Sequence, residues 1–403
     1  MSAIVTTASV LIAAAIGAGD NAPPQIEGID LFERGIPSSV DGSEQPVIIG
    51  VPTGYDHNEP TPLLVGLHTW SADYRQRALL YGREAAQRGW LMVLPDFRGP
   101  NTASNPHARQ AGGSIIAQRD IVDARGWMVE DYNVDLDRVF ITGDSGGGHM
   151  TLLMAAKHPE LWSAAAAWVP VSDLREWWET RPDRRDDLRA ITGGEPGESP
   201  EMDLEYMRRS PRTFMTNLAH LPVLLGHGDN DRLIPVEQSY RTFRALKDLR
   251  GHNTLLHVFS GGHTGLQGFG LDWCVEHARP RPTPADLQLV TDESKAYYRA
   301  ELTMNDESRL ARAELVLGEG VLSVATENLR ELGIDLSDLT LPESGMTLTI
   351  RSDCSLGLTL KNAPGGVQVA SEREWWRVVG RSASGLTLDI SASEETRALK
   401  LLW

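Results

Sequence analysis

Several features are scarce in this chain of 403 residues, and each scarcity narrows the class of protein. Cysteine occurs only at Cys274 and Cys354, so the fold does not depend on a disulfide framework, although a single bridge between the two stays open. Basic residues are outnumbered by acidic ones, which gives a formal net charge of −17 and leaves no basic stripe that could neutralise phosphates. We therefore expect neither nucleic acid nor an anionic membrane surface as a partner.

Sequence patterns of cofactor sites are absent as well. The chain shows no metal-ligand spacing, no phosphate-binding loop and no dinucleotide fingerprint. We therefore predict a protein that uses no cofactor and no metal.

Long apolar runs are also missing. The alanine-rich run at residues 5–18 is too short to span a bilayer but has the length of a signal-peptide core, and no later segment is a transmembrane candidate. We expect residues 1–22 to be a leader that exports the protein, which would then be secreted or periplasmic. No Lys or Arg precedes the run, so an ordinary leader of a cytoplasmic protein is the alternative.

The length of the chain suits two domains, because single hydrophobic cores seldom grow beyond roughly 250–300 residues. The proline-rich segment 280–284 is a natural boundary. Before it, apolar runs alternate with helical segments, which predicts an α/β fold with a doubly wound, mostly parallel sheet over residues 23–279. After it, short alternating runs predict a small antiparallel β-sandwich over residues 280–403. The strands expected there are 297–304, 313–317, 321–326, 346–350 and 386–390.

The most informative feature that is present is the pattern G-x-S-x-G at residues 143–147, which follows the apolar run 139–142. A serine hydroxyl is a weak nucleophile and must stand clear of the backbone, which requires a sharp turn between a strand and a helix. Glycines permit that turn, and residues 150–156 supply a good helix behind it. The pattern predicts that Ser145 is the nucleophile of a serine hydrolase, with a passive serine in a glycine-rich turn as the alternative.

An acid and a histidine follow in the order that such a nucleophile requires. The apolar segment 221–228 predicts a buried strand, and the pattern H-G-x-x-D-x-x-x-P that begins there marks Asp231 as the acid. The segment 254–259 predicts the next strand, and the loop at its end carries His263. In the predicted mechanism His263 takes the proton of Ser145, while Asp231 fixes the tautomer of the imidazole and stabilises its charged form.

Two neighbouring residues, Asp229 and His227, compete for these roles, whereas His149 is tempting only as a ligand-binding residue. Asp229 lies two positions before Asp231 and could enter the same loop, although the Leu-Ile-Pro register that follows favours Asp231. His227 fits a structural turn residue better than a base. His149 lies in the first turn of the helix after Ser145, where we expect it to pack beside the backbone of the nucleophile.

A serine hydrolase also needs two backbone N–H groups that face the oxygen on which charge develops. Gly146, directly after the nucleophile, is expected to supply one. The segment 62–67 predicts a strand that leads into His68-Thr69-Trp70, a turn that resembles the H-G-x turn of many hydrolases with Thr69 in place of the glycine. The second donor is therefore Thr69 or Trp70, and the position favours Trp70, unless this indole is only a core aromatic.

Residues from about 46 to about 277 resemble the catalytic domain of the prolyl oligopeptidase and dienelactone hydrolase branch of the α/β-hydrolases. The resemblance rests on segments 132–139, 143–147, 209–211 and 227–231, and the same pieces occur in secreted bacterial esterases. It implies an α/β-hydrolase fold and a serine hydrolase that forms an acyl-enzyme. Oligopeptidases of this branch carry a large β-propeller ahead of the catalytic domain, and too few residues precede the first expected core strand here. We therefore expect an esterase that acts on a small-molecule or polysaccharide ester, in particular an acyl or methyl ester of a carbohydrate-rich substrate.

Substrate-binding residues are expected at the carboxyl ends of strands and in the polar segment 171–217, where many relatives insert a cap. This segment is rich in tryptophan and arginine, which can stack on sugar rings and hold charged groups with guanidinium forks. An amphipathic surface helix that packs its tryptophans on the core is the alternative. The expected substrate-binding residues are Arg98, Asn101, Trp168, Trp177 and Trp178, and the arginines of the segment include Arg181, Arg184 and Arg185.

Other functions stay open from the sequence. A peptidase of the same branch would need acids that bind a substrate amine, for which Glu176, Glu179 or Asp203 are available. A binding protein that has lost catalysis on a hydrolase scaffold is the second alternative. In the β-domain, the pair Trp375-Trp376 is the only candidate for a carbohydrate platform, and at most one of the two can serve because adjacent strand residues face opposite sides. The sequence does not fix an oligomeric state.

Overall fold

The apolar runs of the first part of the chain form one mixed sheet of eight strands in the order β1-β2-β4-β3-β5-β6-β7-β8. The strands from β3 to β8 run parallel, whereas β1 and β2 join the sheet antiparallel. The first strand begins earlier than the sequence predicted, because β1 precedes residue 46 and pairs along its whole length with β2. The strands are β1 (Ile29–Pro37), β2 (Glu44–Pro52), β3 (Thr61–Leu67), β4 (Leu91–Pro95), β5 (Val134–Asp144), β6 (Ala164–Trp168), β7 (Pro222–Gly228) and β8 (Asn253–Phe259).

The structure is a computed structural model that describes residues 22–249, 253–278, 284–337, 339–364, 367–369, 375–382 and 385–403. The apolar run at residues 5–18 and residues 280–283 of the proline-rich segment lie outside these ranges. Within the described ranges, no helix is long and apolar enough to cross a membrane. Both cysteines are free, with Cys274 in the α/β part and Cys354 in the β part, so the bridge that the sequence left open is not formed.

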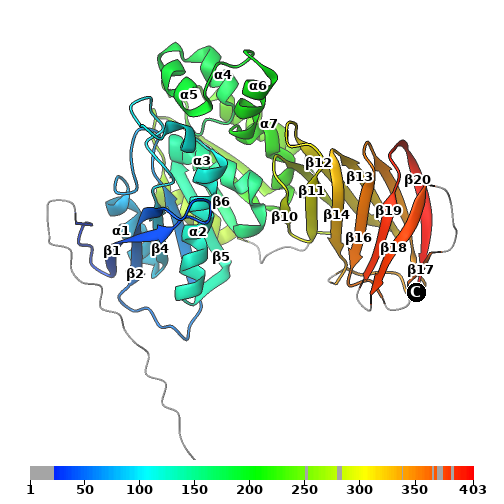
Figure 1. Cartoon of the computed structure of the whole chain (residues 1–403). Coiled ribbons are helices and arrows are strands. Elements are labelled where there is room, and N and C mark those ends of the chain that lie inside the picture. The colour runs from blue at the N-terminus through cyan, green and yellow to red at the C-terminus, as the bar shows by residue number, and fades with distance from the viewer. Residues whose placement is uncertain are drawn as a thin grey trace, which may run out of the picture.

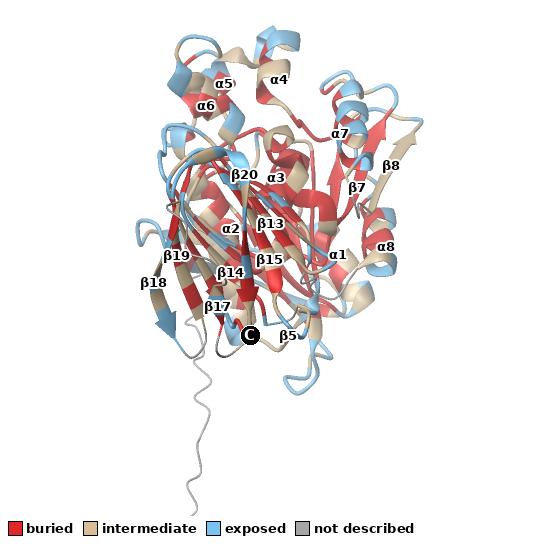
Figure 2. Ribbon diagram, turned by 90° about the vertical axis from the view of Figure 1, so that its right-hand side faces the viewer, coloured by how far each residue is buried: buried red, intermediate tan, exposed pale blue. Residues whose placement is uncertain are grey.

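Helices cover both faces of the sheet, which is the reason its central strands are buried on both sides (Figure 2). On one face, Ile121 of α2 (Ile115–Asp131) and Leu152 of α3 (Gly146–Lys157) enter one apolar core, which also takes Leu246 of α7 (Glu237–Lys247). On the other face, α1 (Ala78–Arg88) and α8 (Gln267–His277) bury Tyr81 and Leu271 in a second core. This is the predicted doubly wound α/β fold.

Three helices stand above the sheet as a cap (Figure 1). The cap is formed by α4 (Leu174–Thr180), α5 (Arg185–Thr192) and α6 (Pro200–Arg208), which the chain inserts between β6 and β7. Its small apolar core includes Trp177, Trp178 and Ile191, together with Trp70 from the loop after β3 and Ile234 from the loop after β7. The cap is therefore packed directly on two loops that follow strands of the sheet.

The second domain is a β-sandwich of two six-stranded sheets (Figure 1). Its interior is filled by alternating apolar residues of both sheets. The expected purely antiparallel pairing is wrong at two places, because β13 pairs parallel with β15 and β14 pairs parallel with β16. One sheet has the order β10 (Lys295–Tyr297), β11 (Ala300–Met304), β14 (Leu329–Asp335), β16 (Leu356–Lys361), β19 (Gly385–Ile390), β18 (Trp376–Ser382). The other has the order β17 (Gln368–Val369), β20 (Ser393–Leu402), β15 (Met346–Ser352), β13 (Val321–Glu327), β12 (Ala311–Gly318), β9 (Leu287–Thr291).

The two domains are joined by buried polar contacts. The ammonium of Lys157, at the end of α3, lies 2.8 Å from a carboxylate oxygen of Asp292, and both side chains are fully buried. The side-chain amide of Asn217 pairs with both the N–H and the carbonyl of Val290 in β9, at 2.8 and 2.9 Å. A buried charge without its partner is costly, so these contacts fix the sandwich to the end of the helix that follows Ser145.

The tryptophan pair of the β-domain does not form an exposed platform. Trp376 is only 8% exposed and belongs to the core of the sandwich. Trp375 is partly buried and lies under the guanidinium of Arg397. Neither indole therefore presents an open face, although Trp376 lines a cavity of about 500 Å³ on the sandwich.

Candidate active site

Ser145 lies at the junction of β5 and α3 with a backbone conformation that few L-residues adopt, φ 59° and ψ −118°. Its N–H donates to the carbonyl of Trp168 at 2.9 Å, and its carbonyl accepts the N–H of His149 at 2.8 Å, so the turn is held on both sides. A Cβ on Gly143 would lie 2.5 Å from the carbonyl carbon of Gly147, which shows how closely the strand and the helix approach. The sharp turn that the sequence predicted is therefore present.

His263 and Asp231 are joined by a hydrogen bond of 2.7 Å between the imidazole Nδ1 and the carboxylate Oδ2. The other carboxylate oxygen accepts the N–H groups of Leu233 and Ile234 at 2.8 and 3.0 Å. Burial raises the pKa of Asp231, but the hydrogen bonds from His227, His263 and Ile234 outweigh it and hold the pKa well below its usual range. An ionised Asp231 accepts the proton on Nδ1, which leaves Nε2 of His263 as the basic nitrogen.

The two rivals of this acid and base have other partners. Nε2 of His227 lies 3.0 Å from the carbonyl of Ile234 and 3.4 Å from Asp231 Oδ2, both acceptors, so this nitrogen carries the proton and Nδ1 accepts from Ser239. His227 therefore stabilises the carboxylate of Asp231 and does not act as the base. Asp229 accepts the N–H of Gly261 at 3.0 Å and so shapes the loop that carries His263, without a bond to the imidazole among the described residues.

The backbone of the Thr69–Trp70 turn lies against the start of α3. A Cβ on residue 146 would lie 2.3 Å from the nitrogen of Trp70, so only glycine fits there. The N–H of Thr69 is already used, because it donates to the side chain of Gln76 at 3.0 Å. In the described part of the chain the N–H of Trp70 has no acceptor, which favours Trp70 over Thr69 as the partner of Gly146 in an oxyanion hole.

Ser145 and His263 line one cavity of about 230 Å³. Within the described residues no hydrogen bond joins the Ser145 hydroxyl to His263; such contacts are often long without substrate. Trp177 of the cap forms part of the wall and meets the ring of Trp70 edge to face, with centroids 4.8 Å apart. The cavity is lined by Thr69, Trp70, Ser71, Arg77, Asp144, Ser145, Trp177, Arg181, Arg184, Leu233, Ile234 and His263.

Similarity to known proteins agrees with this geometry. Residues 75–269 match the prolyl oligopeptidase family. The chain is 31% identical over 180 residues to the uncharacterized peptidase YtmA of Bacillus subtilis. The aligned residues cover 43% of this chain and 67% of that protein. The chain belongs to the prolyl oligopeptidase family. It is therefore a serine hydrolase with the α/β-hydrolase fold, as the sequence predicted.

Other similar proteins include esterases. A probable acetylxylan esterase A of Neosartorya fischeri is 31% identical over 117 residues, which cover 27% of this chain and 31% of that protein. The solved structure of an S-formylglutathione hydrolase from Agrobacterium tumefaciens aligns with a TM-score of 0.50 at 18% identity, over 64% of this chain and 98% of that one. The second similarity concerns the fold alone, and the first covers less than a third of the relative. Membership of the prolyl oligopeptidase family thus leaves open whether the substrate is an ester or a peptide.

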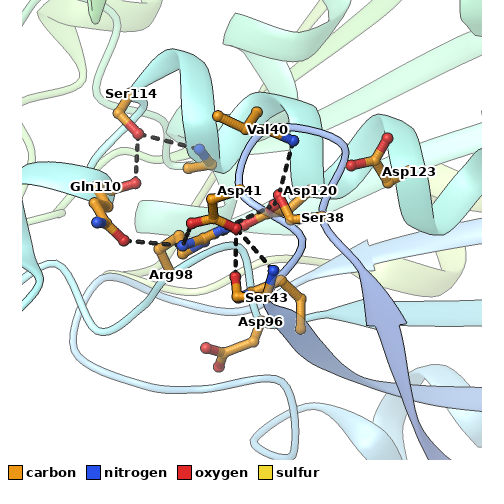
Figure 3. A network of polar contacts seen from close by, with 12 residues as sticks. Ser38, Val40, Asp41, Ser43, Asp96, Arg98, Gln110, Ser114, Asp120 and Asp123 are labelled. Atoms are coloured by element: carbon orange, nitrogen blue, oxygen red, sulfur yellow. Dashed lines mark hydrogen bonds and ion pairs between the residues drawn. The ribbon is translucent and has the colours of Figure 1, made fainter.

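Arg98 does not line the cavity that contains Ser145, although the sequence analysis predicted that it would line the substrate cleft. Its guanidinium donates to Asp120 at 2.5 Å and to Asp41 at 2.9 Å, and it also reaches the side chain of Gln110 at 2.9 Å (Figure 3). The side chain is only 9% exposed. Arg98 therefore ties the loop after β4 to the β1–β2 hairpin and to α2, and has no donor left for a substrate.

Three other residues that were predicted to bind substrate lie in the protein interior and support the structure instead. Asn101 is buried and supports the oxyanion turn, since its N–H donates to the carbonyl of Trp70 at 2.8 Å. Trp168 is fully buried beneath the His263 loop, where a Cβ on Gly265 would touch its ring. Trp178 faces Tyr206 inside the cap and lies beside two arginines. Of the five predicted substrate-binding residues, the structure places only Trp177 in the cavity.

The sequence reasoning missed an ion pair beside the nucleophile. Arg77, at the start of α1, contacts the carboxylate of Asp144, which occupies the second position of the G-x-S-x-G pattern. Burial raises the pKa of Asp144, and the charge of Arg77 opposes that shift. The aspartate inside the motif was a signal that some cation must lie close to it, but nothing in the sequence marked Arg77 as that cation.

His149 fits its predicted packing role. It is fully buried, its Nε2 lies 2.7 Å from the carbonyl of Arg209, and burial lowers the pKa of His149 to about 4. Over the residues that the structure describes, no three His, Cys, Asp or Glu side chains are grouped as metal ligands would be.

Proposed function

We propose that the chain is a carboxylic ester hydrolase in which Ser145, His263 and Asp231 form a catalytic triad. One observation carries the proposal: a serine on a strained elbow shares a cavity with a histidine that is hydrogen-bonded to a buried, ionised aspartate. Histidine held in this way acts as a general base toward a serine hydroxyl.

The reaction begins when the Ser145 oxygen attacks the ester carbonyl while Nε2 of His263 takes its proton. The carbonyl oxygen becomes an oxyanion, and the N–H groups of Gly146 and Trp70 are the donors that would stabilise it, each worth roughly 3 kcal/mol or more. The tetrahedral intermediate collapses when the bond to the alcohol breaks and His263 returns the proton to the leaving oxygen. The products of this half-reaction are the alcohol and an acyl group on Ser145.

Water completes the cycle by the same route in reverse order. His263 removes a proton from a water molecule, the hydroxide attacks the acyl-enzyme, and the second tetrahedral intermediate releases the carboxylic acid with the proton restored to Ser145. Throughout, Asp231 stabilises the imidazolium that forms at each step. The cycle consumes one water and needs no cofactor.

The cavity favours an ester over a peptide with a free amino end. An aminopeptidase needs an acid that receives the substrate ammonium, and the acids that the sequence offered are occupied elsewhere. Glu176 pairs with Arg212 and Arg241, and Asp203 pairs with Arg175. Neither residue lines the cavity, and Glu179 does not line it either.

A carbohydrate ester is the substrate class that we favour. Trp177 contributes the accessible edge of an indole to the cavity beside Ser145, where a sugar can make apolar contact, and a relative named as an acetylxylan esterase matches part of the chain. A peptidase is the second candidate, because the relative YtmA, 67% of whose length this chain matches, is named as one. Export remains a prediction of the leader at residues 1–22.

Hydrolysis of a matched panel tests the proposal. The substrates are p-nitrophenyl acetate and butyrate, acetylated xylan, methylated pectin and aminoacyl p-nitroanilides, each with wild type and Ser145→Ala. We expect ester turnover that disappears in the variant. Turnover of the anilides alone would assign the protein to the peptidases, and absence of all turnover, together with no labelling of Ser145 by a fluorophosphonate, would contradict the triad.

A further inference from the structure

We propose that the substrate carries a carboxylate near the scissile bond and that Arg184 binds it. The proposal depends on the proposed function only in placing the substrate in the cavity of Ser145. It starts from the charge of that cavity: among the residues that the structure describes, three arginines line it, Arg77, Arg181 and Arg184, against the single acid Asp144. This cationic lining is unusual in a chain whose net charge is −17.

Arg77 forms an ion pair with Asp144, the acid in the cavity lining. Its guanidinium contacts Asp144, whose side chain is only 6% exposed, so the charge of this carboxylate is matched before any substrate enters. The Nε of Arg77 is buried and has no acceptor in the described part of the chain. Arg77 therefore offsets the charge of Asp144 in the cavity lining.

Arg181 is used by the protein itself. Its Nε and Nη2 donate to the two carboxylate oxygens of Asp183 at 2.8 and 2.6 Å, and its Nη1 donates to the carbonyl of Leu233. Leu233 belongs to the loop whose N–H groups hold Asp231. Arg181 is thus a positioning residue that fastens the cap to the loop of the acid.

Arg184 is the least satisfied of the three. Its two acid contacts among the described residues are long, 3.6 Å to Asp183 and 3.5 Å to Asp187, at the outer limit of a hydrogen bond. Both acids have shorter bonds to other donors: Asp183 to Arg181 at 2.6 Å, and Asp187 to the N–H of Ala103 at 3.0 Å.

A guanidinium has five N–H donors in a rigid fork, and a carboxylate is the planar anion that matches them. The Arg184 side chain is 30% exposed and lines the cavity, so a ligand can reach it. The cavity is also shielded by Trp70 and Trp177, which strengthens charge pairing compared with open solvent. An acidic ester therefore meets a cation whose contacts with acids are long, whereas an ammonium group would meet three arginines and an aspartate that Arg77 already pairs.

Matched pairs of ligands test the proposal with the carboxylate on either side of the scissile bond. The carboxylate is on the acyl side in mono-4-nitrophenyl succinate against 4-nitrophenyl butyrate, and on the leaving side in 4-acetoxybenzoate against its methyl ester. A third pair needs no turnover: 3-carboxyphenylboronic acid against phenylboronic acid, measured as competition with fluorophosphonate labelling of Ser145. We expect the anionic member of at least one substrate pair, and the carboxyboronate, to be favoured by about tenfold to a hundredfold at low salt.

Variants then assign the preference to Arg184. In Arg184→Gln the preference should fall to near one because the anionic member of each pair loses more than the neutral member, and Arg184→Lys should retain part of the preference, since lysine keeps the charge but loses the fork. The matched control is Arg189→Gln, another cap arginine paired with acids, which does not line the cavity. High salt should weaken the preference in the wild type.

Two results would overturn the proposal: no preference for the anionic member in all three pairs, or an equal effect of Arg184→Gln and Arg189→Gln. A carboxyboronate preference that depends on Arg184, combined with turnover of anilides alone, would keep this proposal and reject the ester hydrolase. Ester turnover without any charge preference would do the reverse.

Discussion

The two walls of the cavity are built in different ways. The sheet wall consists of residues at or just after the carboxyl ends of parallel strands, namely Thr69, Trp70, Asp144, Ser145 and His263. The cap wall consists of Trp177, Arg181 and Arg184, which stand on a helical insertion with its own small core. The first wall is fixed by backbone geometry and the second by side-chain packing and ion pairs.

This difference separates chemistry from selectivity. Strand ends place Ser145 and His263 with little freedom, because the pairing of β5, β6, β7 and β8 sets the spacing of their loops. The cap can change its side chains without moving those loops, apart from the contact between Arg181 and Leu233. We therefore expect sheet-wall substitutions to lower kcat and cap-wall substitutions to change which substrate is preferred.

The largest effect is expected from Asp231→Asn, which would present an amide to Nδ1 of His263 and favour the wrong tautomer. By analogy with other serine hydrolases, kcat should fall by about 10⁴ while the fold is retained. Asp229→Asn is the matched control two residues away, and its oxygen can still accept the N–H of Gly261. Steady-state kinetics on p-nitrophenyl acetate decide; similar losses in both variants would show that the acid is misassigned.

The next effect tests the oxyanion turn. Gly146→Ala would push a methyl group against the nitrogen of Trp70, so the two N–H groups can no longer face one oxygen. We expect kcat to fall by about 10²–10³, as when one donor is removed. Gly126→Ala on α2, where an added Cβ meets nothing within 4 Å, should leave kcat unchanged. An active Gly146→Ala enzyme would place the oxyanion elsewhere.

The sheet wall could largely be predicted from the sequence. Ser145, Asp231 and His263 lie in loops after apolar runs, and each run became the strand that was expected, β5, β7 and β8. Short patterns identify such residues because a parallel sheet brings all strand ends to one edge. The choice between Thr69 and Trp70 needed the structure, since it depends on the side chain of Gln76, which occupies the N–H of Thr69.

The cap wall could not be predicted in the same way. Arg98 and Arg184 both follow strand or helix ends in polar segments, yet Arg98 is enclosed by Asp41 and Asp120 from distant parts of the chain, while Arg184 is not. Trp177 and Trp178 are neighbours, and a helix turns adjacent side chains by about 100°. Which of them meets the cavity depends on how the helix packs, and that information is not local.

A smaller effect distinguishes these two tryptophans. Trp177→Phe should raise KM about threefold to tenfold with kcat little changed, because it reduces the apolar wall without touching Ser145. Trp178→Phe should leave KM within twofold and lower Tm by a few degrees, since that ring packs on Tyr206 inside the cap. Equal KM changes would mean that the cap moves as one body and that neither ring contacts substrate.

The smallest effect on catalysis is expected at Asp96, at the end of β4, which supports the sheet wall without lining the cavity. Its backbone carbonyl lies 2.6 Å from Nε2 of His68, the residue before Thr69. Burial raises the pKa of Asp96 to about 6. Between pH 4 and 6 the unfolded chain has lost this proton while the native state still holds it, so the Asp96 contribution to stability decreases as pH rises and levels off above 6.

Asp96→Asn removes that contribution. Relative to the wild type, the variant should gain about 2 kcal/mol in the free energy of unfolding at pH 7.5 compared with pH 4, since the pKa of Asp96 is raised to about 6 and each pKa unit is worth about 1.4 kcal/mol. Denaturant titrations at both pH values measure the difference, and kcat at pH 7.5 should stay within twofold of the wild type. A loss of kcat would show instead that the charge of Asp96 acts on the oxyanion turn, which would extend the sheet wall beyond the residues that line the cavity.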